Sequence, residues 1–150
     1  MGLRHSEESI GAQSPKRRRQ MREIKFRGKR LDNGAWVYGS LMQLEGSAYI
    51  YDYDIGDNGV SDVPQLSLIR WHADPVTVGQ STGLHDKNGA EIFEGDILKL
   101  KDYHGERIVT VSFHNGAYYC TGDGFSDEYL FNSRDREVIG NIHQHPHLLP

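Results

Sequence analysis

Short apolar runs separated by tight-turn signals are the feature of this chain that most constrains its fold. Each run is rich in Val, Ile, Tyr and Phe, the residue types that favour β-strands. No window longer than about ten residues keeps its apolar side chains at helical spacing, so we expect a mainly β fold with little helix. At most one short helical turn is expected, after Asp74-Pro75. The expected strands are residues 22–27, 36–44, 66–71, 91–101, 107–113, 117–121 and 137–142.

The turn chemistry divides this expected fold into two β regions. Asn33-Gly34, between the first two runs, supplies the positive φ angles of a hairpin turn. The four runs that begin at Ile97, Arg107, Ala117 and Glu137 are close in number and length to the strands of an SH3-like barrel. We therefore expect an N-terminal β-hairpin region over residues 21–80 and a small SH3-like β-barrel over residues 81–150.

The first twenty residues differ in composition from everything that follows them. They mix charge with Gly, Ser, Gln and Pro and hold almost no apolar side chains, so they cannot bury enough surface to offset the entropy of ordering. We expect residues 1–20 to be a disordered basic and polar leader; a native extension or an added leader would give the same pattern. The folded domain should begin at about Met21, where Ile24 and Phe26 alternate with Lys25 and Arg27.

Positive charge is concentrated at the N-terminus. Residues 1–30 carry a net charge of +7, and residues 31–150 carry −11. Such a basic strip creates a strong local positive potential and makes nucleic acid a candidate partner, although the acidic remainder would repel a polyanion. A merely solvated tail is the alternative. The candidate nucleic-acid-binding residues are Lys16, Arg17, Arg18, Arg19, Arg22, Lys25, Arg27, Lys29 and Arg30.

Composition limits the class of protein. The chain has 150 residues, 37% hydrophobic and 25% charged, which is typical of one soluble domain. It contains no apolar run near the roughly 20 residues needed to span a bilayer and no apolar segment that would make a signal peptide, so we expect a cytoplasmic protein. The single cysteine, Cys120, excludes an internal disulfide and a multi-thiolate zinc site. Its neighbours Tyr119 and Thr121 favour a buried strand position and an inert thiol.

Polar residues are densest in residues 81–100, which read STGLHDKNGAEIFEGDILKL. Asp86, Asn88 and Gly89 have the composition of a tight turn, in which the aspartate accepts backbone hydrogen bonds and glycine adopts positive φ. Gly95 and Asp96 stand directly before an apolar strand, where glycine permits a sharp bend and the carboxylate can accept free backbone N–H groups. We expect these five residues to be structural.

A catalytic interpretation of the same stretch was weighed against this one. Glu94 and Asp96 could act as general acid and base, but that chemistry needs a cleft and a partner group, and only His85 is near in sequence. No complete catalytic constellation is found elsewhere in the sequence. We therefore assign no catalytic residue and expect a protein that is not an enzyme.

Three further patterns fail as metal or phosphate sites. Asp52, Asp54 and Asp57 do not follow the spacing of a calcium-binding loop, and the Gly-containing residues 79–83 lack the lysine and helix of a phosphate loop. His143, His145 and His147 would share one face of an extended strand and could chelate zinc or nickel, but Pro146 and the nearby terminus favour a frayed tail. We expect neither a metal nor a cofactor.

Aromatic residues are more numerous than a small core needs. The block at residues 47–63 alternates Tyr49, Tyr51 and Tyr53 along one side of an expected strand, and Tyr118 and Tyr119 occupy both faces of another. An exposed strip of this kind can anchor a protein interface or stack on bases, whereas burial in an ordinary core is the alternative.

Four motifs in order resemble the YopX family of phage and prophage proteins. They are MREIKFRGK, WVYGSL, VTVGQSTGLHDKNGAEIFEGDILKL and VIGNIHQHPHLL, and together they cover residues 21–150. Family members often carry a bulkier residue than Gly28, and Tyr or Phe at the position of Ser81; the three C-terminal histidines are not a family feature. The resemblance implies a small, mostly β protein in a bacterial host cell, with no enzymatic activity to carry over.

Two hypotheses for the function follow. The first is a noncatalytic interaction module that binds a host or phage protein, or a second copy of itself, since edge strands pair readily across subunits. The second is a nucleic-acid-binding accessory protein that uses the basic N-terminal strip. Neither requires a cofactor or a membrane.

Overall fold

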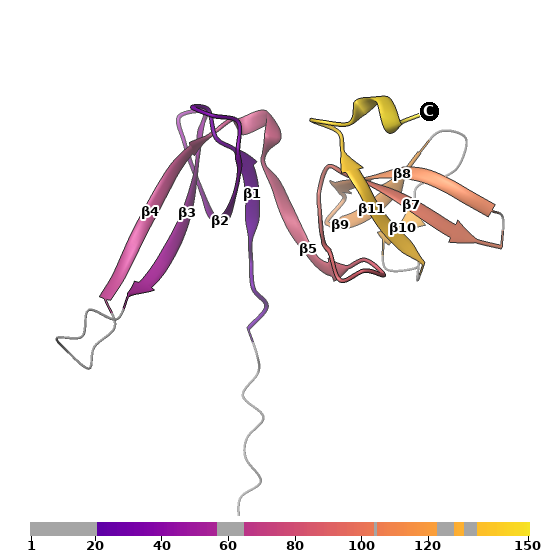
Figure 1. The fold of residues 1–150 in the computed structure, drawn as a ribbon, viewed down its shortest axis with the longest axis horizontal. Coiled ribbons are helices and arrows are strands. Elements are labelled where there is room, and N and C mark those ends of the chain that lie inside the picture. Colours follow the sequence, from indigo (N-terminus) through magenta and orange to yellow (C-terminus); the bar gives the residue numbers. More distant parts are fainter. Residues whose placement is uncertain (1–20, 57–64, 104, 123–127, 131–134) are drawn as a thin grey trace, which may run out of the picture.

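The computed structural model describes residues 21–56, 65–103, 105–122, 128–130 and 135–150. It contains two antiparallel β-sheets, and the prediction of a mainly β fold is confirmed (Figure 1). The described residues contain no α-helix, and none of their helical turns is long and apolar enough to cross a membrane. The predicted leader, residues 1–20, lies outside the described residues.

The first sheet has six strands in the order β4-β3-β2-β1-β5-β6. Its strands are β1 (Phe26–Lys29), β2 (Trp36–Leu44), β3 (Ser47–Gly56), β4 (Gln65–Ala73), β5 (Gly79–His85) and β6 (Glu91–Phe93). At the turn between β1 and β2, Gly34 has a φ of 68° and its N–H donates to the carbonyl of Arg30, while the Asn33 side chain accepts from the N–H of Ala35. This is the position at which the sequence predicts a hairpin turn.

Strand β2 changes its pairing partner at Gly39. The strand pairs with β1 from Trp36 to Gly39 and with β3 from Ser40 to Leu44. Gly39 has a φ of 153°, and a Cβ atom there would lie 1.9 Å from the carbonyl oxygen of Tyr51. Only glycine allows this approach, so the residue fixes the place where β1 and β3 separate.

The far end of β4 returns to the turn after β1. Arg30 forms a bridge with Ala73, and the N–H of Leu31 donates to the carbonyl of His72. Asp74 then caps a 3₁₀ helix, η1 (Pro75–Thr77), which confirms the predicted helical turn. The first hydrophobic core lies inside this curled sheet. Its buried members are Val37, Ile50 and Ala73, with Phe26, Leu41 and Trp71 packed against them.

Gly28 is a tight point of this core. A Cβ atom at Gly28 would lie 3.0 Å from the Cβ of Ala73, closer than ordinary contact. In this chain the pair of small residues lets β1 and the end of β4 approach, so a bulkier residue at position 28 would require movement of its neighbours.

The second sheet has five strands in the order β10-β9-β8-β7-β11. They are β7 (Asp96–Asp102), β8 (Gly105–His114), β9 (Ala117–Thr121), β10 (Glu128–Tyr129) and β11 (Arg136–Asn141). Because β10 and β11 are edges among the described strands, the pairings do not close, and the predicted SH3-like barrel is not confirmed. The second core comprises Ile92, Leu98, Leu100, Val109, Val111, Cys120 and Leu130.

Strands β5 and β6 connect the two sheets (Figure 1). Gly79 of β5 pairs with Arg27 of β1, which places the hairpin in the first sheet. Its residue Ile92 is fully buried in the core of the second sheet. The sequence places the boundary between the two β regions at residue 80. Strand β5 crosses this boundary, and the hairpin of β5 and β6 belongs to both regions.

Candidate functional site

The turn at residues 86–89 is held by one carboxylate. Asp86 is 8% exposed and accepts hydrogen bonds from the backbone N–H groups of Asn88, Ala90 and Val138. Burial by itself would raise the pKa of Asp86, but the three N–H groups outweigh it and the pKa is lowered. Gly89 has a φ of 85° in the same turn. Because Val138 belongs to β11, Asp86 also fastens the turn to the second sheet.

The start of β7 carries a buried ion pair between the two sheets. Asp96 is 1% exposed; its Oδ1 lies 2.6 Å from Nη2 of Arg27, and its Oδ2 accepts from the N–H of Phe93 at 2.8 Å. The Arg27 guanidinium lies between two rings, 4.7 Å from the centre of Trp36 and 4.9 Å from that of Phe93. Gly95, with a φ of 84°, makes the bend that turns the Asp96 side chain toward Arg27.

These contacts give Asp96 a structural task. Burial raises the pKa of the Asp96 carboxyl, and the charge of Arg27 opposes that rise. Both carboxylate oxygens are already engaged, so no oxygen is left to face a substrate. Glu94 is half-buried, with a pKa raised by burial, and His85 is exposed. Of the three residues of the catalytic interpretation, Asp96 is therefore engaged within the fold.

The structure distributes the predicted basic strip among internal contacts. Lys25 Nζ lies 2.6 Å from Glu91, Arg30 pairs with Asp32, and Arg22 lies beside the Tyr118 hydroxyl. Arg27, also in the predicted nucleic-acid set, is 7% exposed, and reaching a phosphate would break its pair with Asp96. Lys29 is half-buried in β1. The remaining candidates, Lys16, Arg17, Arg18 and Arg19, lie outside the described residues.

The C-terminal histidines do not form the expected frayed tail. The Asn141 side chain accepts from the N–H groups of His143 and Gln144, and a 3₁₀ helix, η3 (Pro146–Leu148), follows. The ring of His143 lies 6.1 Å from that of Trp36, and the Trp36 indole N–H donates to the Gln144 side chain. The tail is thereby attached to the first sheet. No group of three metal-ligating side chains is found within the described part of the chain.

Cys120 is an interior thiol. It is 1% exposed in β9, and burial raises its pKa to about 11. A thiol with this pKa holds its proton at neutral pH and is a poor nucleophile.

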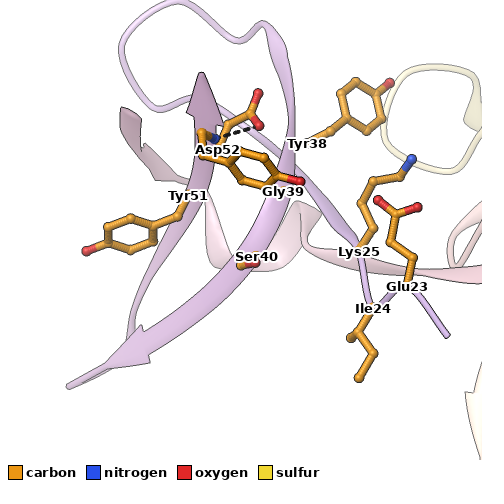
Figure 2. Close-up of a pocket in the computed structure, with 9 residues that line it drawn as sticks. Glu23, Ile24, Lys25, Tyr38, Gly39, Ser40, Tyr51 and Asp52 are labelled. Carbon is orange, nitrogen blue, oxygen red and sulfur yellow. Dashed lines mark hydrogen bonds between the residues drawn. The ribbon is translucent and has the colours of Figure 1, made fainter. Parts of the chain in front are cut away.

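An open groove lies where β1 and β3 separate. It has a volume of about 490 Å³ and lies between the segment before β1 and the strands β2 and β3. Figure 2 shows Glu23 and Lys25 side by side on one wall, with Tyr51 and Asp52 on the facing strand. The lining residues are Glu23, Ile24, Lys25, Tyr38, Gly39, Ser40, Tyr51, Asp52 and Tyr53. The groove exists because Gly39 directs β2 from one partner strand to the other.

The groove exposes large apolar surface beside acidic groups. Ile24 is 62% exposed, Tyr53 63% and Tyr38 45%. Lys25 pairs with Glu91, and the charge of the neighbouring Glu23 adds to the rise of the Lys25 pKa, whereas Asp52 has no ion-pair partner among the residues that the structure describes. The groove therefore combines three tyrosines, one isoleucine and two exposed carboxylates, which outnumber the single lysine among its described residues.

Two other aromatic groups lie outside the groove. Tyr49 stacks on His72 at 4.8 Å, and the Arg70 guanidinium lies over the Tyr49 ring at 5.4 Å, so this ring is engaged by side chains of β4. On the second sheet, the ring of Tyr119 stacks on His114 at 4.1 Å and on Tyr129 at 4.9 Å. These three rings form a ladder across β8, β9 and β10.

Sequence reasoning found the tyrosines but missed the residue that makes the groove. Gly39 follows Tyr38 inside an apolar run, and an isolated glycine in a strand pattern is a signal for a bulge or a close backbone approach. The sequence marks Ser81 only as a position where family members often carry Tyr or Phe. Its hydroxyl donates to Glu91 at 2.6 Å, which orients the carboxylate that pairs with Lys25.

The fold and the site define a protein of two antiparallel β-sheets that share a hairpin and present an open tyrosine-lined groove. A sequence model of the YopX protein family matches residues 25–150, and the chain belongs to this family. The crystal structure of protein EF1440 from Enterococcus faecalis is similar, with a TM-score of 0.57 and 25% sequence identity. The similarity covers 85% of this chain and 99% of EF1440. No curated protein matches the chain.

Proposed function

We propose that this protein is a noncatalytic interaction module, encoded by a phage or prophage, that binds a host or phage protein in the bacterial cytoplasm. The groove between residues 23–25 and β2 and β3 is the binding site. Its combination of exposed tyrosines, an exposed isoleucine and open volume is the observation that carries the proposal. Tyrosine supplies a large contact area with few rotatable bonds, which suits an interface.

The contacts outside the groove also support the groove as the binding site. The polar residues of the 81–100 stretch hold turns and join the sheets, so their chemistry is used within the fold. The described basic residues are mostly paired or buried, which weakens their use on a polyanion. The groove keeps two largely exposed side chains, Ile24 and Tyr53, that belong to neither hydrophobic core.

Capture from a host lysate with the full chain, followed by binding of the purified captured protein, tests the proposal. The change Ile24→Ser with Tyr53→Ala removes exposed groove surface without touching either core. We expect the affinity to fall about tenfold or more, since each truncated contact residue contributes on the order of 1 kcal/mol. Thermal unfolding should stay close to that of the unchanged protein.

Tyr103→Ala is the matched control, because Tyr103 is fully exposed at the end of the second sheet, away from the groove. This variant should keep full affinity. If the groove variant and the control bind equally well, the groove is not the interface. Sedimentation of the same samples also reports self-association, which remains a prediction.

Nucleic-acid binding is the second candidate function. Exposed aromatic surface on the second sheet favours it, because Tyr129 is 45% exposed and aromatic side chains can stack on the bases of a single strand. Lys16, Arg17, Arg18 and Arg19 would supply the phosphate contacts.

Fluorescence anisotropy with labelled DNA and RNA at two salt concentrations tests this candidate. Binding should weaken steeply as salt rises, and both Tyr129→Ala and the joint change of Arg17, Arg18 and Arg19 to Ala should reduce it. Affinity that does not respond to salt, or is unchanged in both variants, would exclude this function.

A further inference from the structure

We infer that the groove takes an extended peptide segment that carries Lys or Arg side chains. This inference rests on the interaction function proposed above and specifies the chemistry of its partner. Three observations carry it: the excess of carboxylates over cations in the described lining of the groove, its exposed tyrosine rings, and the separated strand edges that form its walls.

Charge complementarity selects a cationic occupant. Glu23 and Asp52 line opposite walls, and the one cation among the described groove residues, Lys25, lies 2.6 Å from Glu91 and also beside Glu23. Asp52 accepts only the N–H of its neighbour Tyr53 among the described residues, so its carboxylate can bind a further donor. An anionic occupant would meet two like charges, whereas a basic one places a cation against each wall.

The tyrosines of the groove also favour a positively charged occupant. Tyr38 and Tyr53 expose about half or more of their surfaces beside these carboxylates. Tyrosine faces attract guanidinium and ammonium groups, and arginine uses this contact more often than lysine. The interior of the same protein shows the arrangement, since Arg27 lies between the rings of Trp36 and Phe93 while it pairs with Asp96.

The backbone geometry favours an extended occupant. The carbonyl of Lys25 accepts from the N–H of Ser81 at 2.7 Å, so Lys25 directs its main-chain groups toward β5. In an extended chain the next residue along directs its groups to the opposite side. The main chain of Ile24 therefore faces the groove, because β2 stops pairing with β1 at Gly39 and pairs with β3 from Ser40 onward. A peptide strand can hydrogen-bond such an edge while its alternate side chains enter the groove.

Binding of a labelled peptide to the full chain tests the inference. The probe has the sequence of residues 14–20, SPKRRRQ, and a matched peptide has glutamine at its four basic positions. We expect the basic peptide to bind at least tenfold more tightly than the glutamine peptide. Glu23→Gln with Asp52→Asn should weaken the basic peptide about tenfold, the loss expected for two partly exposed charged contacts.

Glu45→Gln with Glu106→Gln is the control variant. It removes the same charge from two exposed positions outside the groove and should leave binding of the basic peptide unchanged. If both double variants weaken binding equally, attraction to the acidic chain as a whole explains it, and the inference is wrong. The same conclusion follows if the glutamine peptide binds as tightly as the basic one.

Two further outcomes identify other occupants. The full chain carrying Lys16→Gln, Arg17→Gln, Arg18→Gln and Arg19→Gln should bind the basic peptide at least as tightly as the unchanged chain. Tighter binding means that the chain's own basic segment competes for the groove, which supports the basic chemistry. The chain could instead form a dimer through the groove. If Ile24→Ser dissociates that dimer and Glu23→Gln with Asp52→Asn leaves it intact, the groove binds a second copy and the inference is wrong.

The inference and the proposed function can fail separately. If the captured protein loses affinity for the Ile24→Ser, Tyr53→Ala variant but neither peptide binds, the interaction function stands and the basic partner is wrong. If the captured protein ignores the groove and the peptides also fail to bind, both proposals fall.

Discussion

The junction around Arg27 and the groove around Ile24 are three residues apart along one segment, but they handle charge differently. At the junction, Arg27 and Asp96 are both buried, and burial raises the pKa of Asp96 against the influence of Arg27. At the edge of the groove, Lys25 and Ser81 more than offset the burial of Glu91 and lower its pKa. In the groove itself, Glu23 and Asp52 are exposed to solvent, and Asp52 accepts only the N–H of Tyr53 among the described residues. The comparison suggests that buried charges hold the sheets together and exposed ones are left for binding.

The largest expected effect comes from removing one half of the junction pair. Asp96→Asn leaves the Arg27 charge buried beside a neutral group, and the free energy of unfolding should fall by about 3–5 kcal/mol. Denaturant unfolding followed by tryptophan fluorescence measures the loss. Replacing both partners, with Arg27→Met and Asp96→Leu, should restore part of it. If Asp96→Asn lowers the free energy of unfolding by less than about 1 kcal/mol, the pair is dispensable for stability.

The strand switch that opens the groove should be the next most sensitive feature. Gly39→Ala places a Cβ atom 1.9 Å from the Tyr51 carbonyl oxygen, so we expect a loss of about 2–4 kcal/mol. Gly46→Ala is the matched control, because Gly46 also has positive φ, 81°, but a Cβ there meets nothing within 4 Å. It should cost only about 1 kcal/mol. Equal losses in thermal unfolding would mean that φ alone, and not the close approach, makes glycine necessary.

The pair at the groove edge should have a smaller, pH-dependent effect. Glu91→Gln should lower the free energy of unfolding by about 1 kcal/mol at pH 7, since both side chains are partly exposed. Because the pKa of Glu91 is lowered on folding, its contribution is present above the unfolded pKa of about 4.3 and disappears as the pH falls through the folded value. Unfolding at pH 7 and pH 3 should therefore show the two proteins converging in acid. A difference that grows in acid would contradict the assigned sign.

The smallest effect is expected at the interior thiol. Cys120 should not react with a thiol reagent at pH 8 in the native protein, because it is buried and its pKa is about 11. In denaturant one thiol per chain should react, since the sequence has one cysteine. Rapid reaction of the native protein would show that the second core opens readily.

Local features of this fold could be predicted from the sequence because their signals lie within a few residues. The helical turn after Asp74-Pro75 is an example, since its Asp cap and its proline are adjacent. The bend at Gly95 is another, because it directly precedes the apolar start of β7. The mainly β character followed from the apolar runs.

Features that join distant segments could not be predicted in this way. Arg27 was assigned to a nucleic-acid strip because its neighbours are basic, and its partner Asp96 lies 69 positions away. The C-terminal tail was expected to fray because of Pro146, but Asn141 accepts two backbone N–H groups and Gln144 reaches Trp36, 108 positions earlier. The groove depends on how β2 divides its pairing at Gly39, which a single run of residues does not reveal.

The shared hairpin has a consequence for how the chain matures on the ribosome. The first sheet includes β6, and Arg27 gains its counter-charge only when Asp96 has been synthesised. Until about two thirds of the chain has emerged, the nascent N-terminal half holds an unpaired arginine and an incomplete sheet edge. The long sequence separation of these contacts also slows their formation. The N-terminal half should therefore gain its stability together with the C-terminal half instead of before it.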